Sequence, residues 1–417
     1  MRTIEEHAAA VAELVGDALA RPRIERLRVD ASDIGQLASY RWRVLAADVI
    51  APLDLPPFDN SQMDGYAVDS RALAAGAATL RVGPRIPAGR FPPPLEAGTA
   101  APIMTGAVLP DGADAVVPIE AADPARFLPE NTTSDVVLPG PVPAEQFVRR
   151  IGTDVRAGET LLVRGTVLRP AHWGILAASG VEVVDVVAKP RILVVSTGSE
   201  LAPAGGGLGA AEIHDANGAS LSAALAESGA EVLLHRVSDD AETLLDVIRK
   251  YGGGDTGLDL VVTTGGVSAG AYEVVRDAFE GRGVRFESVA MQPGGPQGWG
   301  LLDSGDFTVP VVCFPGNPVS TLVSFEAFLR VPLLAAGRRP QPRRDAVARL
   351  AEAADSPPGK HQIRRGRLDA DGRVHLVGGP SSHLLHSYAR SNVLAHIPLG
   401  VAHVEAGDEV VVWALDD

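Results

Sequence analysis

The sequence contains 417 residues with a net charge of −15, and 46% of its residues are hydrophobic. A chain of this length is too long for one core, so it predicts about two to four domains, and its apolar content excludes a disordered protein. An acidic chain without a long basic block lacks the basic face of a nucleic-acid-binding protein, so we expect no nucleic-acid partner.

The cysteine count and the N-terminus exclude further classes of protein. The single cysteine, Cys313, rules out an intrachain disulfide and a cysteine-based zinc site, and its apolar surroundings predict a buried core residue. The N-terminus carries acids where a signal peptide needs a basic stretch, and no apolar run reaches the ~18–20 residues that span a bilayer. We therefore expect a cytoplasmic protein without a membrane partner.

The first half of the chain predicts helices on either side of a β-rich region. Residues 4–21 carry apolar side chains at helical spacing, and a second helix is expected over 34–51. Short apolar runs at 79–82, 115–119 and 135–138 then alternate with glycine and proline, as in a small β-rich domain. A further helix is expected over 171–179.

The second half alternates strand-length apolar runs with helical segments. Strands are expected at 191–196, 231–237, 259–263, 285–290 and 309–314, and helices at 219–227, 241–251, 271–280 and 319–334. This order predicts a parallel sheet covered on both faces, with ligands bound at the carboxyl ends of its strands. After a linker at 338–344, short strands at 346–351, 361–368, 374–377, 393–397 and 409–413, with a hairpin turn at 369–372, predict a β-barrel or sandwich.

Three strand ends of the predicted sheet lead into glycine-bearing loops. These loops cover Ser196–Leu201, Thr263–Gly270 and Phe314–Ser320, and a helix follows the second and the third. Glycine lets the backbone approach an anion closely, and a helix N-terminus supplies unpaired N–H groups. None of the loops has a Walker or dinucleotide-binding pattern. Together at one sheet edge, they predict a site for phosphate or another oxyanion.

Carboxylates accompany these loops at Glu200, Asp215, Asp239, Asp240 and Glu273. Asp215, Asp240 and the neighbouring Asn217 could equally serve only as helix caps. Carboxylates that gather beside an anion repel it unless a hard cation lies between them. The pattern therefore predicts Mg²⁺ at this site.

The most distinctive stretch is a proline-rich segment at residues 55–67. Its sequence, Pro56-Pro-Phe-Asp-Asn-Ser-x-Met-Asp-Gly-Tyr-Ala67, resembles the hallmark of the MoeA family of molybdopterin molybdenumtransferases, to which the gephyrin E domain is related. Further motifs of that family follow in order: Ile103-Met-Thr-Gly106, Pro110-x-Gly-Ala-Asp-Ala-Val-Val117, Gly152-x-Asp154 and the three glycine-bearing loops. The resemblance extends from residue 4 to residue 415, essentially the whole chain.

The resemblance implies an α/β multidomain fold in four parts. Residues 1–52 and 146–188 would form an elongated N-terminal domain, and 53–145 a β-rich domain that carries the hallmark segment. Residues 189–338 would form a three-layer, doubly wound MogA-like domain, and 339–417 a C-terminal β-barrel. The family also implies a homodimer, with its site between the α/β domain of one subunit and the hallmark segment of the other.

The resemblance implies an enzyme that inserts molybdate into adenylylated molybdopterin, with Mg²⁺-dependent release of AMP. A molybdopterin adenylyltransferase would be its upstream partner. The family's catalytic positions correspond to Asp64, Thr105, Asp154, Glu200, Asp239 and Glu273, of which Glu200, Asp239 and Glu273 would hold the metal. The substrate-binding positions would be Asp59, Asn60, Ser61, Ser196, Thr197, Gly198, Asp215, Thr264, Gly265, Gly266, Val267, Ser268, Gln292, Pro293, Pro315, Gly316, Asn317, Pro318, Ser320 and Arg365.

Two departures from the family pattern bear on activity. Glu273 replaces a common aspartate, which keeps the charge and lengthens its reach. Gln292-Pro-Gly-Gly-Pro296 replaces a Lys-Pro-Gly-Lys-Pro segment, which removes two ammonium groups from an anion site. Cations that could compensate are Arg149, Arg150, Arg156, Lys360, Arg364 and Arg365. The alternatives are a molybdopterin-binding paralogue or scaffold with altered activity, and an adenylyltransferase, which would need only the α/β domain.

Overall fold

The structure, a computed structural model, describes residues 1–29, 42–128, 134–253, 257–268, 273–337 and 345–415. The chain forms two compact units: unit 1 combines Met1–Ile24 with Val187–Asp417, and unit 2 is Glu25–Val186. Residues 34–41 of the expected helix 34–51, the start of the expected helix 271–280, the end of the loop at Gly270 and the linker 338–344 lie outside the described residues.

Unit 2 contains a five-stranded sheet in the region that the sequence predicts to be β-rich. Its strands, in the order β7-β4-β6-β5-β8, are β4 Gly65–Val68, β5 Ala78–Val82, β6 Thr99–Ile103, β7 Ala115–Pro118 and β8 Asp135–Leu138. The three expected strands are confirmed. The short helical turn η1 Ser70–Leu73 lies between β4 and β5, and η2 Ile119–Ala121 lies between β7 and β8. The hallmark segment runs into this sheet through β4, and β3 Asn60–Ser61 pairs with β9 Val148–Arg149. The middle and the end of the segment are therefore fixed by strand pairing.

The rest of unit 2 is a small layer of paired strands with one helix. Here β1 Ile24–Arg28 pairs with β11 Val183–Val187, β2 Val49–Ile50 pairs antiparallel with β10 Thr160–Leu162, and α3 is Pro170–Ala178. The predicted helix over 34–51 is wrong for residues 42–51, because Val44 and Leu45 instead pair with Val167 and Val186. Long-range pairing and burial override the helical preference of the local sequence there.

Unit 1 is built on a six-stranded mixed sheet in the order β15-β12-β16-β20-β19-β17. The strands are β12 Arg191–Thr197, β15 Glu231–Val237, β16 Leu260–Thr264, β17 Val284–Ser288, β19 Pro296–Asp303 and β20 Thr308–Phe314. Five of them, β17 included, run in the same direction as predicted, but β19 runs antiparallel to its neighbours β20 and β17. The sheet is therefore not wholly parallel. Two short parallel strands, β13 Leu201–Ala202 and β14 Ile213–His214, extend the first loop.

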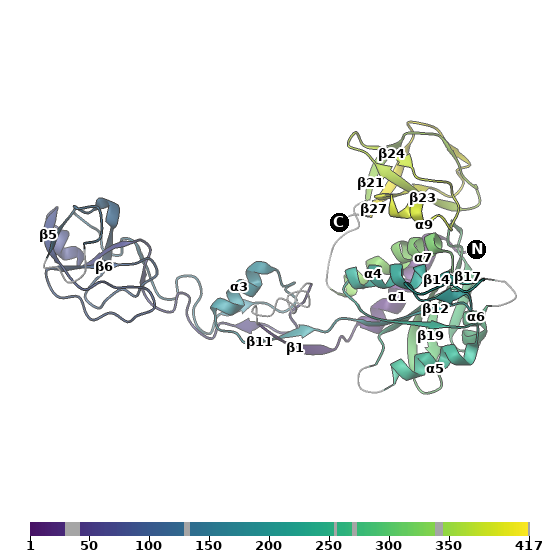
Figure 1. Cartoon of the computed structure of the whole chain (residues 1–417), viewed down its shortest axis with the longest axis horizontal. Helices are drawn as coiled ribbons and strands as arrows, with labels where there is room; N and C mark the ends of the chain where they lie inside the picture. The colour runs from purple at the N-terminus through teal and green to yellow at the C-terminus, as the bar shows by residue number, and fades with distance from the viewer. Residues whose placement is uncertain (30–41, 129–133, 254–256, 269–272, 338–344, 416–417) are drawn as a thin grey trace. The chain divides into compact units, whose positions relative to one another are not determined.

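Helices cover both faces of this sheet, as predicted. On β12, Ile192 and Val194 join a core with α1 Ile4–Leu19, α4 Ala216–Glu227 and the helix at 318–336, while Leu193 and Val195 join a core with α5 Ala241–Gly252 and α6 Val274–Phe279. Alternate side chains of a strand point to opposite faces, which produces this division. Figure 1 shows α4 and α7 on one side of β12 and α5 on the other.

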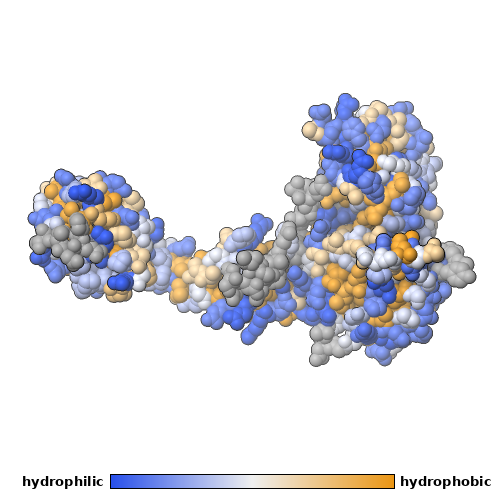
Figure 2. Space-filling model, viewed as in Figure 1, coloured by the Kyte–Doolittle hydropathy of each residue, from blue (hydrophilic) through white to orange (hydrophobic). Residues whose placement is uncertain are grey.

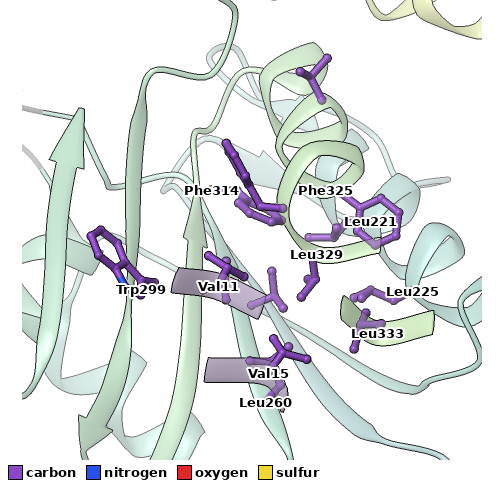
Figure 3. Packing of buried hydrophobic residues seen from close by; sticks show 14 of the residues in the cluster. Val11, Val15, Leu221, Leu225, Leu260, Trp299, Phe314, Phe325, Leu329 and Leu333 are labelled. Atoms are coloured by element: carbon purple, nitrogen blue, oxygen red, sulfur yellow. The ribbon is translucent and has the colours of Figure 1, made fainter. Parts of the chain in front are cut away.

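The N-terminal helix α1 packs on the α/β core, although the sequence groups it with residues 25–52. Thr3 and Glu6 form a capping box at its start, and Val11 and Val15 are buried against Leu329 and Leu333 (Figure 3). These partners belong to one continuous helix made of α7 Pro318–Ser324, the π-turn η3 Phe325–Leu329 and α8 Arg330–Ala336. By length and composition alone this helix could cross a membrane, but 56% of its 18-residue apolar window is buried inside the protein.

The C-terminal part of unit 1 is a closed five-stranded barrel, as predicted. Strands β21 Asp345–Leu350, β23 His361–Leu368, β24 Arg373–Leu376, β25 Val393–Ile397 and β27 Glu409–Ala414 close through the pairing of β23 with β25. The turn at 369–372 joins β23 and β24 as an antiparallel hairpin. Strand β18 Met291–Gln292 pairs parallel with β23, and β22 Ala354–Asp355, β26 His403–Val404 and α9 Leu385–Ala389 complete this part. Apolar and hydrophilic residues alternate in patches on the visible surface (Figure 2).

Candidate functional site

Side-chain hydrogen bonds tie together the loops at the carboxyl edge of the unit 1 sheet. The Asn217 amide, in the first turn of α4, donates to Thr264 Oγ1 at 3.0 Å and to the Gly316 carbonyl at 2.6 Å. The Thr321 hydroxyl donates to the Pro315 carbonyl at 2.7 Å and lies 3.2 Å from the Thr264 hydroxyl. The loops after β16 and β20 and the start of α4 therefore form one connected surface.

Glycines allow the backbones of these loops to approach one another. Gly265 has a φ of +98°, and a Cβ atom there would lie 2.8 Å from the Thr197 carbonyl oxygen and 2.7 Å from its hydroxyl. A Cβ on Gly316 would lie 3.2 Å from Gly265 Cα. The loops after β12, β16 and β20 thus meet around Gly265, where only glycine combines the left-handed backbone with the close approach. The predicted clustering of the three loops at one edge is observed in the described residues.

Two of the predicted carboxylates act as helix caps. Asp215 accepts a hydrogen bond from Gly218 N at 2.7 Å at the start of α4, and Asp240 accepts from Thr243 N at 2.8 Å at the start of α5. The Thr243 hydroxyl and N–H hold the pKa of Asp240 below its usual value. Asp215 is buried, and its Oδ2, like the buried hydroxyl of Ser196, has no hydrogen-bond partner among the described residues.

The other carboxylates bind the loops themselves. Asp239 accepts a hydrogen bond from Ser199 N at 3.0 Å, which links the loop after β15 to the loop after β12. Glu273 accepts from Ser268 N at 2.8 Å. The Glu200 carboxylate folds over Gly198, so close that a Cβ on Gly198 would lie 2.5 Å from Glu200 Oε2. Adjacent Asp239 and Asp240 therefore have different roles: Asp240 caps α5, and Asp239 faces the loop that carries Glu200.

These carboxylates provide oxygen ligands of the type that Mg²⁺ prefers. Within the described ranges, no three His, Cys, Asp or Glu side chains are grouped closely enough to form a ready metal site. Magnesium in phosphate sites is usually held by one or two carboxylates together with phosphate oxygens and water. Glu200 and Asp239, on two linked loops, fit that mode of binding better than a closed protein cage.

The segment after β17 contacts both the helix at 318–336 and the barrel. The Gln297 amide donates to the Gly294 carbonyl and to Ser324 Oγ, each at 2.7 Å. Across the β18–β23 pair, Gln362 Nε2 donates to Gln292 Oε1 at 2.8 Å. The Arg365 guanidinium is buried and donates to the Gly379 carbonyl, and burial lowers its pKa. Gln292 thus lies where the barrel joins the α/β core, and Arg365 is bound within the C-terminal part.

Other predicted binding residues of unit 1 differ in accessibility. Gly316 and Asn317 are exposed at the start of α7, and Ser268 is exposed beside Glu273. The remaining ones are buried or half-buried: Ser196, Thr197, Thr264, Gly265, Gly266, Val267, Pro293, Pro315, Pro318 and Ser320. Val267 belongs to the core that contains α5 and α6. These buried residues shape the edge, and the exposed residues are free to contact a ligand.

In unit 2 the hallmark segment places Asp64 beside Thr105. Asp64 Oδ1 accepts hydrogen bonds from Thr105 N at 2.7 Å and from the Thr105 hydroxyl at 2.8 Å. These two bonds lower the pKa of Asp64, so its exposed carboxylate is ionised at neutral pH. The two residues predicted as catalytic from separate motifs are therefore in direct contact.

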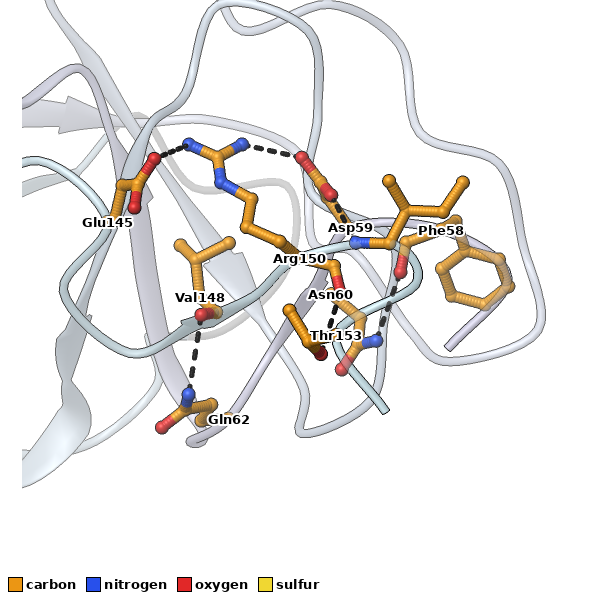
Figure 4. A network of polar contacts seen from close by, with 9 residues as sticks. Phe58, Asp59, Asn60, Gln62, Glu145, Val148, Arg150 and Thr153 are labelled. Atoms are coloured by element: carbon orange, nitrogen blue, oxygen red, sulfur yellow. Dashed lines mark hydrogen bonds and ion pairs between the residues drawn. The ribbon is translucent and has the colours of Figure 1, made fainter. Parts of the chain in front are cut away.

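The start of the hallmark segment is fixed by an ion-pair network (Figure 4). Arg150 donates to Asp59 at 2.5 Å and to Glu145 at 3.1 Å, and Ile151 N donates to Asp59 at 2.7 Å. Desolvation alone would raise the pKa of Asp59, but the bonds from Ile151 and Arg150 outweigh it and lower the pKa. Asp59 is thereby used within unit 2, which favours a positioning role over direct contact with a ligand.

The neighbouring predicted residues of unit 2 are held mainly by backbone contacts. Asn60 donates to the Phe58 carbonyl at 3.1 Å, and the Ser61 hydroxyl donates to the Met63 carbonyl at 2.5 Å. Asp154 is exposed, and its N–H donates to the Leu55 carbonyl at 2.9 Å. The structure places Thr105 against the hallmark segment that carries Asp59, Asn60, Ser61 and Asp64, and it places the turn with Asp154 against the beginning of that segment.

Some residues of the site were not predicted from the sequence. Asn217 and Thr321 connect the strand-end loops, and Gln362 contacts Gln292. Because Asn217 follows Asp215 by two residues, the sequence pattern indicates only a second helix-capping residue there. Thr321 lies in a largely apolar helix, where a buried polar side chain is expected to bond a neighbouring segment, whereas Gln362 lies among polar and charged residues and carries no such signal.

Relatives of this chain are found along its whole length. Three family models match it: the MoeA N-terminal region (domain I and II) over residues 2–180, a probable molybdopterin binding domain over 193–336, and the MoeA C-terminal region (domain IV) over 347–415. A protein of Mycobacterium tuberculosis (strain ATCC 25618 / H37Rv), molybdopterin molybdenumtransferase 2, is 41% identical over 100% of both chains. The molybdopterin molybdenumtransferase of Synechococcus elongatus is 36% identical over 89% of this chain and 92% of its own.

A solved structure resembles the fold. The crystal structure of the molybdopterin biosynthesis moea protein from Pyrococcus horikosii matches with a TM-score of 0.74 and 29% identity. The match covers 98% of this chain and 99% of the other. The family models and the structural match extend over both units.

Proposed function

Because this chain belongs to the MoeA family of molybdopterin molybdenumtransferases, enzymes of molybdenum cofactor biosynthesis, we propose that it inserts molybdenum from molybdate into adenylylated molybdopterin and releases AMP. The family membership gives the class of reaction. The adenylylated form of the substrate and the cleavage of its pyrophosphate link are the proposed part.

The connected strand-end loops of unit 1 are the observation that best supports this substrate. They lie in the region that matches the molybdopterin binding model. Gly265, Gly316 and the first turns of two helices meet there, so backbone N–H groups and helix N-termini are available to an anion. A pyrophosphate link, with several anionic oxygens, suits such an edge better than a neutral ligand does.

We propose Mg²⁺ as the cofactor, held by Glu200 and Asp239 together with phosphate oxygens, with Glu273 as a further ligand. When bound, the ion would neutralise charge on the pyrophosphate link. The chain's own contribution is to hold these carboxylates in place: Ser199 ties the loop of Asp239 to the loop of Glu200, and Ser268 holds Glu273 within its own segment. In the hallmark segment, the ionised Asp64 can accept a proton or a hydrogen bond but is poorly suited to donate a proton at neutral pH.

We further propose that the chain forms a homodimer in the cytoplasm and receives its substrate from a molybdopterin adenylyltransferase. A groove of about 730 Å³ supports the dimer, since it is lined by small and apolar residues of α1 and the helix at 318–336, among them Ala12, Gly16, Val331 and Ala335. An exposed apolar groove of this kind is typical of a surface that another chain covers.

The proposal is tested with purified protein, adenylylated molybdopterin, molybdate and Mg²⁺. Wild type should release AMP and form active cofactor, whereas Glu200→Gln and Asp64→Asn should lower the rate by at least about a hundredfold. Both replacements keep the shape of the side chain, and the amide oxygen introduced by Asp64→Asn can still accept the hydrogen bonds from Thr105, so folding should be unchanged. Glu227→Gln, at the exposed far end of α4, is the matched control.

Three results separate this proposal from its rivals. Consumption of ATP with molybdopterin would identify an adenylyltransferase instead. Binding of the adenylylated substrate without AMP release would identify a paralogue or scaffold. Wild-type rates in both Glu200→Gln and Asp64→Asn would show that AMP release does not use the proposed site.

A further inference from the structure

A row of three polar side chains connects the barrel interior to the segment after β17. Arg364 Nη1 donates to Gln362 Oε1 at 3.4 Å, and Gln362 Nε2 donates to Gln292 Oε1 at 2.8 Å. Gln362 and Arg364 are two residues apart on β23 and therefore share one face of the strand. Gln292 lies directly opposite Gln362 in the β18–β23 pair. The three side chains form a continuous hydrogen-bonded row.

The hydrogen bonds of this row can be donated in only one direction, from Arg364 through Gln362 to Gln292. A guanidinium is always charged and can only donate, so Gln362 must turn its carbonyl oxygen towards Arg364. The Gln362 amide nitrogen then faces Gln292, which must in turn present its own carbonyl oxygen. The donors left over are the two N–H groups of Gln292. Arg364 thus fixes the orientation of both glutamine amides.

Burial makes this row an unusual feature. Gln362 is 2% exposed and Arg364 is 9% exposed, and Gln292 at the outer end is half-buried. Among the described residues, Arg364 forms no ion pair within 4.0 Å, and its other hydrogen bond goes to the Gly378 carbonyl at 3.3 Å. Burial lowers the pKa of Arg364, with Glu352 opposing the shift from a longer distance. A buried cation is costly unless neighbouring dipoles or anions stabilise it.

The outer end of the row lies near the strand-end loops of the proposed substrate site. A Cβ on Gly294, two residues after Gln292, would lie 3.6 Å from the Ser320 carbonyl and 3.1 Å from Ser324 Oγ. Ser320 is in the first turn of α7, next to the exposed Gly316 and Asn317. The backbone two residues after Gln292 therefore packs against the start of α7, beside the surface proposed to bind an anion.

We propose that Arg364 and Gln362 are positioning residues that hold the Gln292 amide with its N–H groups directed to an oxyanion of the substrate. This inference rests on the proposed function and concerns the same site. A neutral amide with a fixed orientation replaces a mobile charged side chain as the anion donor. Of the cations that could compensate for the absence of lysine in this segment, Arg364 has a described hydrogen-bonded path to Gln292, whereas Arg150 is bound by Asp59 and Glu145.

Anion titrations of the intact protein test the row. The probes are inorganic pyrophosphate, for the phosphates of the substrate, and molybdate, for the metal oxyanion, each measured by calorimetry. Arg364→Met, Gln362→Met and Gln292→Met should each weaken binding of one probe about tenfold, which is the worth of one oriented hydrogen bond to an anion. The probe that weakens identifies the oxyanion. Arg367→Met, exposed on the same strand, is the matched control for loss of charge.

A double-mutant cycle distinguishes positioning from simple charge. If Arg364 acts through Gln292, then Arg364→Met combined with Gln292→Met should bind no more weakly than Gln292→Met alone. Arg364→Lys, which keeps a donor for Gln362, should restore part of the affinity. Multiplied losses in the double variant, or unchanged binding of both probes in all single variants, would overturn the proposal.

The folding of the variants and the activity of the protein are measured independently of the anion titrations. Melting temperatures check whether the buried Gln362→Met variant folds, and if it does not, the cycle between Arg364→Met and Gln292→Met gives the answer without it. The titrations involve no turnover, so a failure of AMP release would refute the proposed function and leave the measured coupling between Arg364 and Gln292 intact.

Discussion

Replacing His7 by phenylalanine should make unit 1 more resistant to acid. His7 is fully buried in α1, with its ring edge-on to Trp299 at 4.8 Å and to Phe328 at 4.5 Å between ring centroids. Neither ring nitrogen has a hydrogen-bond partner among the described residues. Burial, with a smaller contribution from Arg2, lowers the pKa of His7 from 6.5 to about 4. The folded protein therefore holds this histidine neutral.

The sign and size of the effect follow from the two pKa values. Because the folded pKa is lower than the unfolded one, the unfolded chain binds a proton first as the pH falls, and stability is lost between pH 6.5 and about 4. Each pKa unit corresponds to about 1.36 kcal/mol. Protonation of His7 should therefore lower the free energy of unfolding by about 3 kcal/mol when the pH has fallen to about 4. Phenylalanine keeps the ring packing and removes this loss.

The measurement is the unfolding free energy of unit 1 as a function of pH. Urea titrations followed by pulsed hydrogen exchange in peptides from α1 and β19 report on this unit alone. The difference between His7→Phe and wild type should grow by about 3 kcal/mol from about pH 7.5 to about pH 4. A difference that stays constant with pH would refute the reasoning, because it would mean that His7 is not held neutral by burial.

The exposed His403, whose pKa is shifted in the opposite direction, serves as the control. Hydrogen bonding to Asp355 raises the pKa of His403, so its contribution is present at low pH and lost as the pH rises through the folded pKa. His403→Gln should therefore lower stability in acid, where His7→Phe raises it.

Three further predictions concern the loops and the hallmark segment. Gly265→Ala should destabilise unit 1 by about 1–3 kcal/mol, because of its φ of +98° and the nearby Thr197 carbonyl, while Gly257→Ala, with open space around it, should not; melting curves compare the two. Asp59→Asn should destabilise unit 2 by about 1–3 kcal/mol, and this loss should disappear in urea titrations below the lowered pKa of Asp59, where the wild-type carboxyl is also neutral. Gly295→Lys should tighten pyrophosphate binding about tenfold, since a Cβ there meets no atom closer than 3.4 Å, and calorimetry that shows no change would mean that other donors already suffice.

Much of the fold was predictable because continuous apolar runs mark buried strands. Strands β15, β23 and β25 have the expected bounds. Strand β19 was missed because Gly298 and Gly300 interrupt its apolar pattern, and its place is set by pairing with β17 and β20 on either side. The helix expected over 34–51 failed in its described part, residues 42–51, for a related reason: apolar residues there pair with segments more than a hundred residues later, which local spacing does not reveal.

The site was predictable where a topological rule applies and unpredictable where side-chain contacts decide. Parallel strands end at one edge, so the loops after β12, β16 and β20 were expected to meet. The roles of Asp239 and Asp240 were not separable, since either adjacent acid suits a helix cap. The link from Arg364 to Gln292 joins two distant segments across the β18–β23 pair, and only the strand register brings them together.

The insertion of unit 2 between α1 and the rest of unit 1 has a consequence for synthesis of the chain. Helix α1 leaves the ribosome before its partner α8, which follows about three hundred residues later, on the order of 15–60 s at ordinary rates of translation. Unit 2 can be completed in that interval, during which the apolar face of α1 has no core to pack against. Assembly of unit 1 is therefore expected to be largely post-translational, and α1 is the segment whose exposure a chaperone would have to manage.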